Sequence, residues 1–311
     1  MKMKFVFIAA IISVGFYLSG CEKESSVERG VVVPVVTNLV MDSNYLDKIV
    51  FIDLATGDTT GYNKYNYDNL KRVVSLSEYE AISLNTFQNR DNTYYSYNGN
   101  DTVPFKMLST DVSINMNTND STITYFAFIN NKRVSDSLIN IYYGNLQANG
   151  TFYRTVSKTI KNYQYVSNNI FCRTQSIALY DNGPFPITPT LYVSTDTANL
   201  DSNGNLIFCK HFESGFTTII STFTYDNKSN PFYKLSNYHA ILILPYGETF
   251  IDEMQAKNNR LHAIESNGVA GGGFNEDLTG KYIYRLNGYP KQINDIAPVG
   301  TFKTIFIYRS L

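Results

Sequence analysis

Aromatic residues recur along the chain in pairs spaced two positions apart, and a short run of Asn, Asp or Gly follows each pair. Tyr65-x-Tyr67, for example, is followed by Asp68-Asn69. Period-two spacing puts both aromatic side chains on one face of a β-strand. Asn, Asp and Gly tolerate the backbone angles of tight hairpin turns. Further copies are Tyr95-x-Tyr97, Phe126-x-Phe128, Phe223-x-Tyr225 and Tyr282-x-Tyr284, and residues 201–205 read as one more turn.

The repetition of strand and turn predicts an all-β fold in which successive strands pair as an antiparallel meander. We expect one strongly curved sheet or a closed barrel, because closure removes exposed strand edges. One or two short helices are expected within it. Residues 76–83 offer a capping pattern, with Ser77 three residues before Glu80, and residues 248–257 carry apolar positions at helical spacing.

The N-terminus has a different pattern, with Lys2 and Lys4 before an uncharged, mostly apolar run from Phe5 to Leu18. This run is too short for a spanning helix and fits a secretory signal peptide. It ends in Leu18-Ser19-Gly20-Cys21, which resembles a lipobox, so Cys21 is the predicted site of lipid attachment. Ordinary secretion with a chance cysteine is the alternative.

The predicted organisation is therefore a lipoprotein signal peptide over residues 1–20, the lipidated cysteine and an N-terminal tether over 21–45, and a single β-domain over 46–311. Acyl chains on Cys21 would hold the protein at a membrane.

Composition supports the strand pattern and narrows the partners. The chain has 25 Tyr, 20 Phe and no Trp, and only 17% of its residues are charged. Aromatic residues suit a pleated, half-buried surface. A formal net charge of −1 gives no reason to expect a nucleic-acid partner. Tyrosine rows can stack on sugars or other ligands, but core packing or cross-strand pairing is the preferred explanation, the more so because Trp is missing.

The C-terminal third resembles a known group of proteins. The stretch from Thr224 to Tyr233, which contains Tyr225-Asp226-Asn227, and the later Tyr282-x-Tyr284-x-x-Asn287-Gly288 are similar to lipoproteins of the Bacteroidota with YD-like repeats and a porin-like β-fold. The resemblance covers residues 220–311 best and departs from the pattern over 140–220. It implies a β-fold and a lipid-anchored place at the outer membrane. That group has no assigned activity, and the surface and periplasmic faces stay open alternatives.

The cysteines offer a second prediction. With Cys21 used for the lipid, Cys172 and Cys209 form an even pair in an oxidising compartment, so we predict a disulfide between them. Two separately buried thiols are the competing interpretation. A metal site formed with His211 is a third one, because Cys172, Cys209 and His211 together could supply three metal ligands.

Catalytic motifs are weak throughout. No Gly-x-Ser-x-Gly sequence occurs, and Gly268 with 271–273 reads as a flexible hairpin loop rather than a phosphate-binding loop. Glu248, Asp252 and Glu253 form a possible glycosidase acid/base group, although acidic residues also suit the first turn of a helix. No cofactor is expected.

Four Ser or Thr residues directly follow an aspartate, and these sequences resemble the short acceptor pattern for general O-glycosylation in the Bacteroidota. These candidate sites are Thr59, Thr102, Ser137 and Thr197. Asp-Ser and Asp-Thr pairs also favour turns, which is the structural alternative.

Two hypotheses on function follow. The preferred one is a non-catalytic, lipid-anchored protein of the cell envelope that binds a glycan, a lipid or a protein, or serves as a structural surface module. The alternative is a glycosidase-like envelope hydrolase that acts through carboxylates. Two carboxylates close together in a cleft would favour the second hypothesis.

Overall fold

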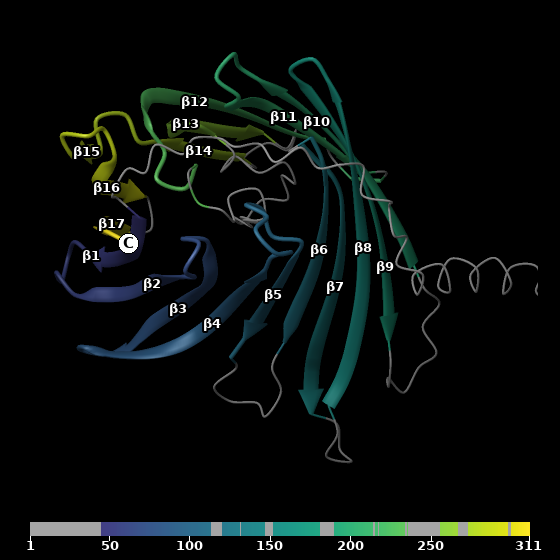
Figure 1. The fold of residues 1–311 in the computed structure, drawn as a ribbon, viewed down its shortest axis with the longest axis horizontal. Coiled ribbons are helices and arrows are strands. Elements are labelled where there is room, and N and C mark those ends of the chain that lie inside the picture. Colours follow the sequence, from purple (N-terminus) through teal and green to yellow (C-terminus); the bar gives the residue numbers. More distant parts are fainter. Residues whose placement is uncertain are drawn as a thin grey trace, which may run out of the picture. The chain divides into compact units, whose positions relative to one another are not determined.

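One antiparallel sheet of 17 strands makes up the described part of the chain in the computed structural model (Figure 1). The structure describes residues 45–112, 120–130, 132–146, 152–180, 190–213, 215–216, 218–233, 235, 256–266, 273–297 and 300–311. All of them belong to one compact unit, Asp42–Leu311.

The strands follow one another along the chain at short intervals. They are β1 (Tyr45–Asp53), β2 (Thr59–Tyr67), β3 (Val73–Ser83), β4 (Thr86–Ser96), β5 (Lys106–Asp111), β6 (Ser121–Ile129), β7 (Lys132–Leu146), β8 (Phe152–Val166), β9 (Asn169–Tyr180), β10 (Thr190–Leu200), β11 (Leu206–Glu213), β12 (Ile219–Ser229), β13 (Asn258–Ser266), β14 (Gly273–Asp277), β15 (Tyr282–Tyr284), β16 (Pro290–Ala297) and β17 (Gly300–Arg309).

Each strand from β1 to β13 pairs with the next one in an antiparallel ladder. β15, β16 and β17 continue the pattern, and β17 pairs back with β1. Within the described residues no ladder joins β14 to β15. The sheet is therefore curled but not closed, which confirms the predicted all-β meander and its strong curvature.

The helix predicted over residues 76–83 is wrong. These residues lie inside β3, where Leu76 is opposite Tyr65 on one side and Thr93 on the other. Pairing on both edges satisfies the backbone groups of this segment, and such tertiary context overrides a weak local helix signal. The second predicted helix, residues 248–257, lies almost entirely outside the described residues, and residues 256–257 are not helical.

Four of the five predicted aromatic pairs, all except Tyr282 and Tyr284, share one face and belong to the core. One buried cluster contains Tyr65, Tyr95 and Phe126 and includes Phe306 of β17, with Tyr67, Tyr97 and Phe128 packed against it. Strands far apart in the sheet meet in this cluster, so it lies on the concave face. A second cluster continues along the same face of β8 to β13 and includes Ile170, Cys172, Cys209 and Phe223.

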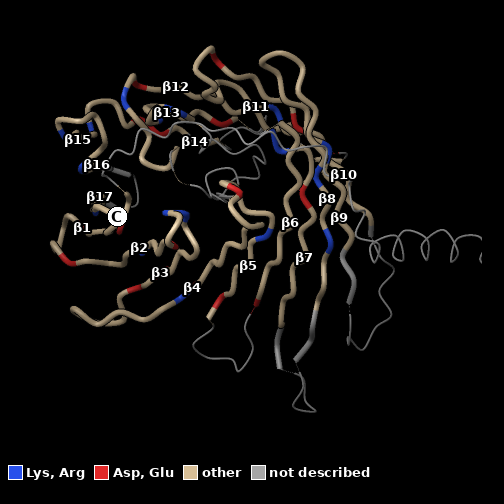
Figure 2. Tube along the Cα trace, viewed as in Figure 1, with Lys and Arg blue, Asp and Glu red and all other residues tan. Residues whose placement is uncertain are grey.

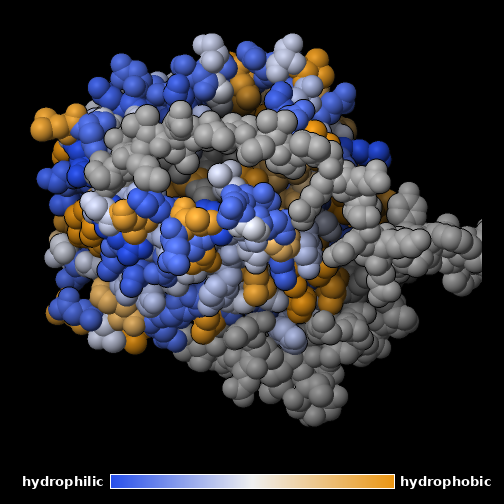
Figure 3. All heavy atoms as spheres, viewed as in Figure 1, coloured by the Kyte–Doolittle hydropathy of each residue, from blue (hydrophilic) through white to orange (hydrophobic). Residues whose placement is uncertain are grey.

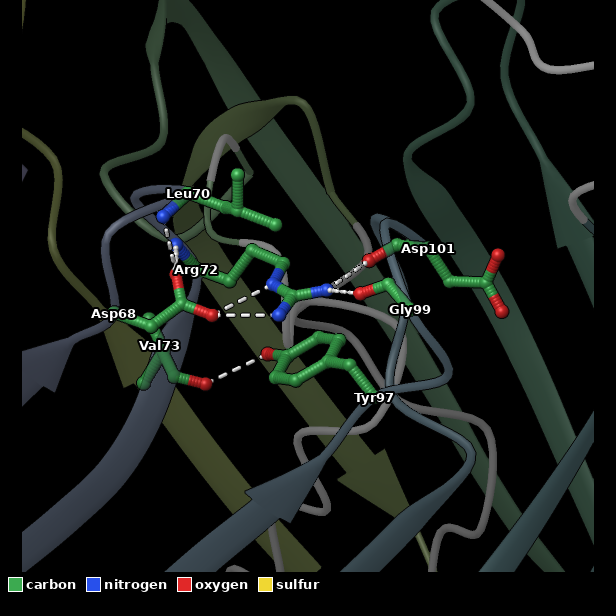
Figure 4. A network of polar contacts seen from close by, with 7 residues as sticks. All are labelled: Asp68, Leu70, Arg72, Val73, Tyr97, Gly99 and Asp101. Carbon is green, nitrogen blue, oxygen red and sulfur yellow. Dashed lines mark hydrogen bonds and ion pairs between the residues drawn. The ribbon is translucent and has the colours of Figure 1, made fainter.

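The turn after β2 shows why the aromatic-Asx unit recurs (Figure 4). Asp68 Oδ1 accepts hydrogen bonds from the backbone N–H groups of Leu70 and Arg72, and Asp68 Oδ2 accepts one from Arg72 Nε. Lys71 takes the positive φ of 61° that the turn requires. The guanidinium of Arg72 then lies 4.4 Å from the ring centroid of Tyr97 and donates to the carbonyl oxygens of Gly99 and Asp101. One turn therefore anchors the next.

The turn between β10 and β11 repeats this geometry. Asp201 Oδ1 accepts from the backbone N–H groups of Asn203 and Asn205, and Gly204 holds a φ of 85°. Tyrosine hydroxyls add a second recurring bond, because each donates to a backbone carbonyl at the start of a preceding strand. The pairs are Tyr67 with Leu46, Tyr97 with Val73, Tyr225 with Leu206 and Tyr308 with Pro290.

Candidate functional site

Three carboxylates lie next to one another across neighbouring strands on the concave face. Glu78 of β3 is directly opposite Asp91 of β4, and Asp91 is directly opposite Asp111 of β5. Leu76 and Tyr95, which share this face, pack in or against the first core cluster. Like charges opposite each other destabilise a sheet, so this arrangement is unfavourable for folding alone.

The electrostatic environment of the carboxylates reflects this crowding. Burial raises the pKa of Glu78, and the neighbouring Asp91 raises it further. The pKa of Asp91 is raised in the same way, by burial and then by Asp111. Arg90 opposes both shifts, but its guanidinium is turned to solvent and lies 3.1 Å from Glu80 and 3.8 Å from Asp91.

Asp91 and Asp111 open onto a pocket of about 250 Å³, which we call the acidic pocket. Its other lining residues are Ser109, Asp120, Ser121, Thr122, Asn140, Ile141 and Tyr142. Asp120 is oriented by the backbone, because its Oδ1 accepts the N–H of Tyr143 at 2.7 Å. Tyr142 is 57% exposed, so its ring is available at the pocket.

Short polar side chains continue from the acidic pocket along the concave face. Thr93 bonds to Ser109, Thr122 bonds to Asn140, and Asn140 bonds in turn to Ser157. Carboxylate and amide oxygens accept hydrogen bonds from ligand hydroxyls, and an exposed tyrosine ring offers an apolar face for stacking. Chemically, the acidic pocket suits a ligand rich in hydroxyl groups.

A second group of charged residues, on β7 to β11, is buried and paired across the strands. Arg133 donates two hydrogen bonds to Asp136, at 2.5 and 2.6 Å, and Tyr163 donates a third at 2.7 Å. His211 Nδ1 lies 2.8 Å from Asp196 Oδ1. Figure 2 shows acidic and basic residues on neighbouring strands in this part of the sheet. These pairs compensate the buried charges, and a pocket of about 400 Å³, whose lining includes Tyr163, Cys172 and Asp196, opens beside them.

Cys172 and Cys209 also lie in this interior, and the structure records both as thiols rather than as a disulfide. Cys172 is opposite Asp196 and Cys209 is opposite Ala198, so β10 runs between them. Two strand spacings place the two Cα atoms at least about 9 Å apart, beyond the limit of about 7 Å for a bridge. The predicted disulfide is therefore not formed, and the alternative of two buried thiols is the arrangement found.

Burial, followed by the charge of Asp196, raises the pKa of the Cys172 thiol to about 12. A thiol with so high a pKa is an inert side chain rather than a nucleophile. Among the described residues, no three His, Cys, Asp or Glu side chains are grouped so that they could hold a metal ion. Cys172, Cys209 and His211 therefore do not form the metal site that the sequence left open.

The four candidate glycosylation residues lie in different settings. Thr102 is exposed in the turn before β5, and Thr59 is the first residue of β2. Ser137 and Thr197 lie within β7 and β10, where their preceding aspartates, Asp136 and Asp196, are buried. Of the four, Thr102 has the most accessible surroundings.

Several sequence candidates lie outside the described residues. They are Cys21, Glu248, Asp252, Glu253, Gly268, Gly271 and Gly272. Gly273 is the first residue of β14, and His262 lies in β13, where its Nε2 contacts Asn275 Oδ1 at 2.8 Å. No helix able to span a membrane occurs among the residues that the structure describes.

The acidic pocket was missed in the sequence because its residues come from four strands. Glu78, Asp91 and Asp111 each stand among alternating polar residues that look like an ordinary solvent-facing strand edge. The sequence did contain one signal. In these strands apolar residues such as Leu108 and Ile123 alternate with polar residues, which indicates that the polar residues share one face of the sheet and the apolar residues the other. Only the register shows that the polar positions line the concave face.

No family model and no curated protein matches the chain. Two solved structures are similar to it. One is a porin-like protein from Bacteroides vulgatus ATCC 8482, 13% identical, with a TM-score of 0.47 over 86% of this chain and 100% of that chain. The other is a porin-like protein from Bacteroides uniformis ATCC 8492, 11% identical, with a TM-score of 0.34 over 85% of this chain and 98% of that chain. Neither likeness is close enough to assign a family or a function.

Proposed function

We propose that the chain is a lipid-anchored, non-catalytic protein of the cell envelope that binds a glycan in the acidic pocket. The observation that carries the proposal is the pocket itself, in which Asp91, Asp111 and Asn140 converge beside the exposed ring of Tyr142. The lipobox-like sequence ending at Cys21 supports the anchor and the outer-membrane location.

Glycan chemistry fits this pocket better than lipid or nucleic-acid chemistry. A lipid ligand needs a mostly apolar lining, whereas most of the residues that line this pocket carry a carboxylate, amide or hydroxyl group. Carboxylates repel the phosphates of nucleic acids. Sugar hydroxyls, in contrast, donate hydrogen bonds to carboxylates, and sugar C–H faces stack on tyrosine rings.

A glycan array with the purified protein, followed by calorimetry on the best ligand, tests the proposal. Asp111→Asn should weaken binding about tenfold or more, because a hydrogen bond to a charged acceptor contributes roughly 1.5–3 kcal/mol. Tyr142→Ala should weaken it about threefold to tenfold through lost stacking. Glu80→Gln, a change to an exposed carboxylate outside the pocket, is the control and should leave affinity unchanged. Glycan binding that is unchanged in both pocket variants would contradict the proposal.

A second candidate function is a glycan hydrolase that uses the carboxylates of Glu78 and Asp91, at the edge of the acidic pocket. The observation that favours it is the direct opposition of Glu78 and Asp91 with raised pKa values. Side chains directly opposite each other have Cβ atoms about 4.5–5.5 Å apart, so the two carboxyl groups are within reach of the separation of about 5–5.5 Å that retaining glycosidases use. Product analysis on each bound glycan separates the two functions. A hydrolase would release products and lose turnover in Glu78→Gln, whereas a binder would release none.

A further inference from the structure

A row of apolar side chains runs across the convex face of β4 to β10. Its members are directly opposite one another from strand to strand: Tyr94, Leu108, Ile123, Ile139, Lys158, Ile177 and Leu191. We call this set the outer row. The residues that alternate with it, such as Tyr95, Met107 and Leu138, are buried on the concave face. The outer row therefore faces away from the core.

More apolar side chains extend the outer row along the strands. Tyr125 and Ile129 of β6 are 42% and 59% exposed, and Tyr94 and Leu191 at the two ends of the row are 48% and 55% exposed. Figure 3 shows hydrophobic residues reaching the surface between hydrophilic ones on the face that it presents. Three outward positions on a strand cover about 13 Å, roughly half the hydrocarbon thickness of a bilayer.

The concave face next to the outer row carries the opposite chemistry. Thr93, Ser109, Thr122, Asn140 and Ser157 are also opposite one another in the ladders or joined by hydrogen bonds. Of these two neighbouring rows, the polar one thus points into the curl and the mostly apolar one points out. A water-soluble curled sheet has the reverse pattern, so the convex face needs an apolar partner.

We propose that the outer row rests in the interfacial layer of a lipid bilayer, at the depth of one leaflet. The chemistry of the row favours this partner, because Tyr94, Tyr125 and Lys158 combine an apolar body with a polar tip, as residues at a membrane interface do. Lys106 Nζ lies 5.6 Å from the ring centroid of Tyr125, which places a positive charge at the edge of the same patch. Cationic groups there would meet lipid phosphates.

The length of chain between the predicted anchor and the sheet is compatible with this arrangement. The chain from Cys21 to Tyr45, the first residue of β1, spans at most about 80 Å when extended. The convex face of β4 to β10 can thus reach the bilayer that holds the acyl chains. The acidic pocket lies on the concave face, so binding of a glycan there and contact with lipid do not compete for the same surface.

The chain contains no Trp, so single introduced tryptophans report on this face without background. Tyr94→Trp and Leu191→Trp probe the two ends of the outer row, and Ile307→Trp is the matched control, because Ile307 is 41% exposed on β17. Each lipidated full-length variant is reconstituted into phosphatidylcholine vesicles with and without bromine on the acyl chains. We expect at least a twofold loss of fluorescence at both row positions and little change at position 307.

Absence of quenching at the row, or equal quenching at position 307, overturns the proposal. Aqueous acrylamide then identifies the reason: protection from acrylamide means that protein covers the row, and accessibility means that water does. The inference relies on the proposed anchor only to bring this face to the bilayer. If the protein stays bound to the vesicles but its tryptophan fluorescence is not quenched, the contact between the outer row and lipid is refuted and the proposed function is unaffected.

Discussion

At the scale of single residues, some buried carboxylates of this sheet are paired with hydrogen-bond donors and others lie opposite another carboxylate. Asp136 is held by Arg133 and Tyr163, so its charge is compensated within the interior. Glu78 and Asp91 face each other instead, and burial and mutual repulsion raise both pKa values. Stability is commonly lost where a site is kept for function, which is why the second group is the better functional candidate.

Replacing Asp91 by Asn should therefore stabilise the protein at neutral pH. A raised pKa in the folded state means that ionisation destabilises the fold, and the penalty builds up as pH rises above the unfolded carboxyl pKa of about 4. We expect the free energy of unfolding to increase by roughly 0.2–1 kcal/mol at pH 7, with no gain at pH 3. Urea unfolding of Asp91→Asn at both pH values measures this. Glu80→Gln is the control, and destabilisation of Asp91→Asn at pH 7 would contradict the argument.

Residue identities alone were a poor guide to which side chains meet. Cys172 and Cys209 have similar local sequences, Ile-Phe-Cys in both, yet β10 separates them. The opposition of Glu78, Asp91 and Asp111 was equally unreadable, because a shift of one residue in register would move each to the other face. Register depends on turn lengths and bulges, such as the one after Glu78, and these are not encoded in one short motif.

At the scale of elements, the local signals predicted most of the strands and several turns. The alternating Tyr65 and Tyr67 and the following Asp68 were sufficient to predict the end of β2 and its turn, because the hydrogen bonds of this turn lie within five residues. The helix over 76–83 failed for the converse reason, since its outcome depended on pairing with β2 and β4. The hydroxyl bonds of the tyrosines, which cross to a preceding strand, also needed the structure.

These tyrosine bonds should each contribute measurable stability. Tyr97→Phe removes the bond of 2.7 Å to the carbonyl oxygen of Val73, which is fully buried, and should cost about 1 kcal/mol. The ring under Arg72 is retained. Tyr225→Phe, which loses the bond to Leu206, should cost a similar amount, and the two losses should add because the sites are distant. Denaturant unfolding with Tyr94→Phe as the exposed control, expected within about 0.5 kcal/mol of wild type, tests this.

At the scale of the whole molecule, the meander could be predicted because the same strand-and-turn pattern repeats along the chain. The missing ladder between β14 and β15 could not be predicted from that pattern. Curling joins β17 to β1 and brings residues such as Phe306 and Phe126 into one core. It also places the acidic pocket on the concave face and the outer row on the convex one. In the proposed arrangement the convex face meets lipid and the acidic pocket stays open to water.

The last prediction concerns the lipid anchor at Cys21 and is tested in cells that export the protein. Cys21→Ser removes the thiol that accepts the acyl chains, so the variant should stay unprocessed or appear in the soluble fraction. Each buried methylene contributes about 0.8 kcal/mol, and stable anchoring takes more than one acyl chain. The outer row alone is therefore expected to hold the unlipidated protein only weakly. Fractionation of cells, with mass spectrometry of the N-terminal peptide, measures both processing and location. Leu39→Ser, a change that removes an apolar side chain outside the lipobox, is the control and should leave the protein in the membrane fraction. Membrane association of a processed Cys21→Ser variant as firm as that of wild type would show that the lipobox interpretation is wrong.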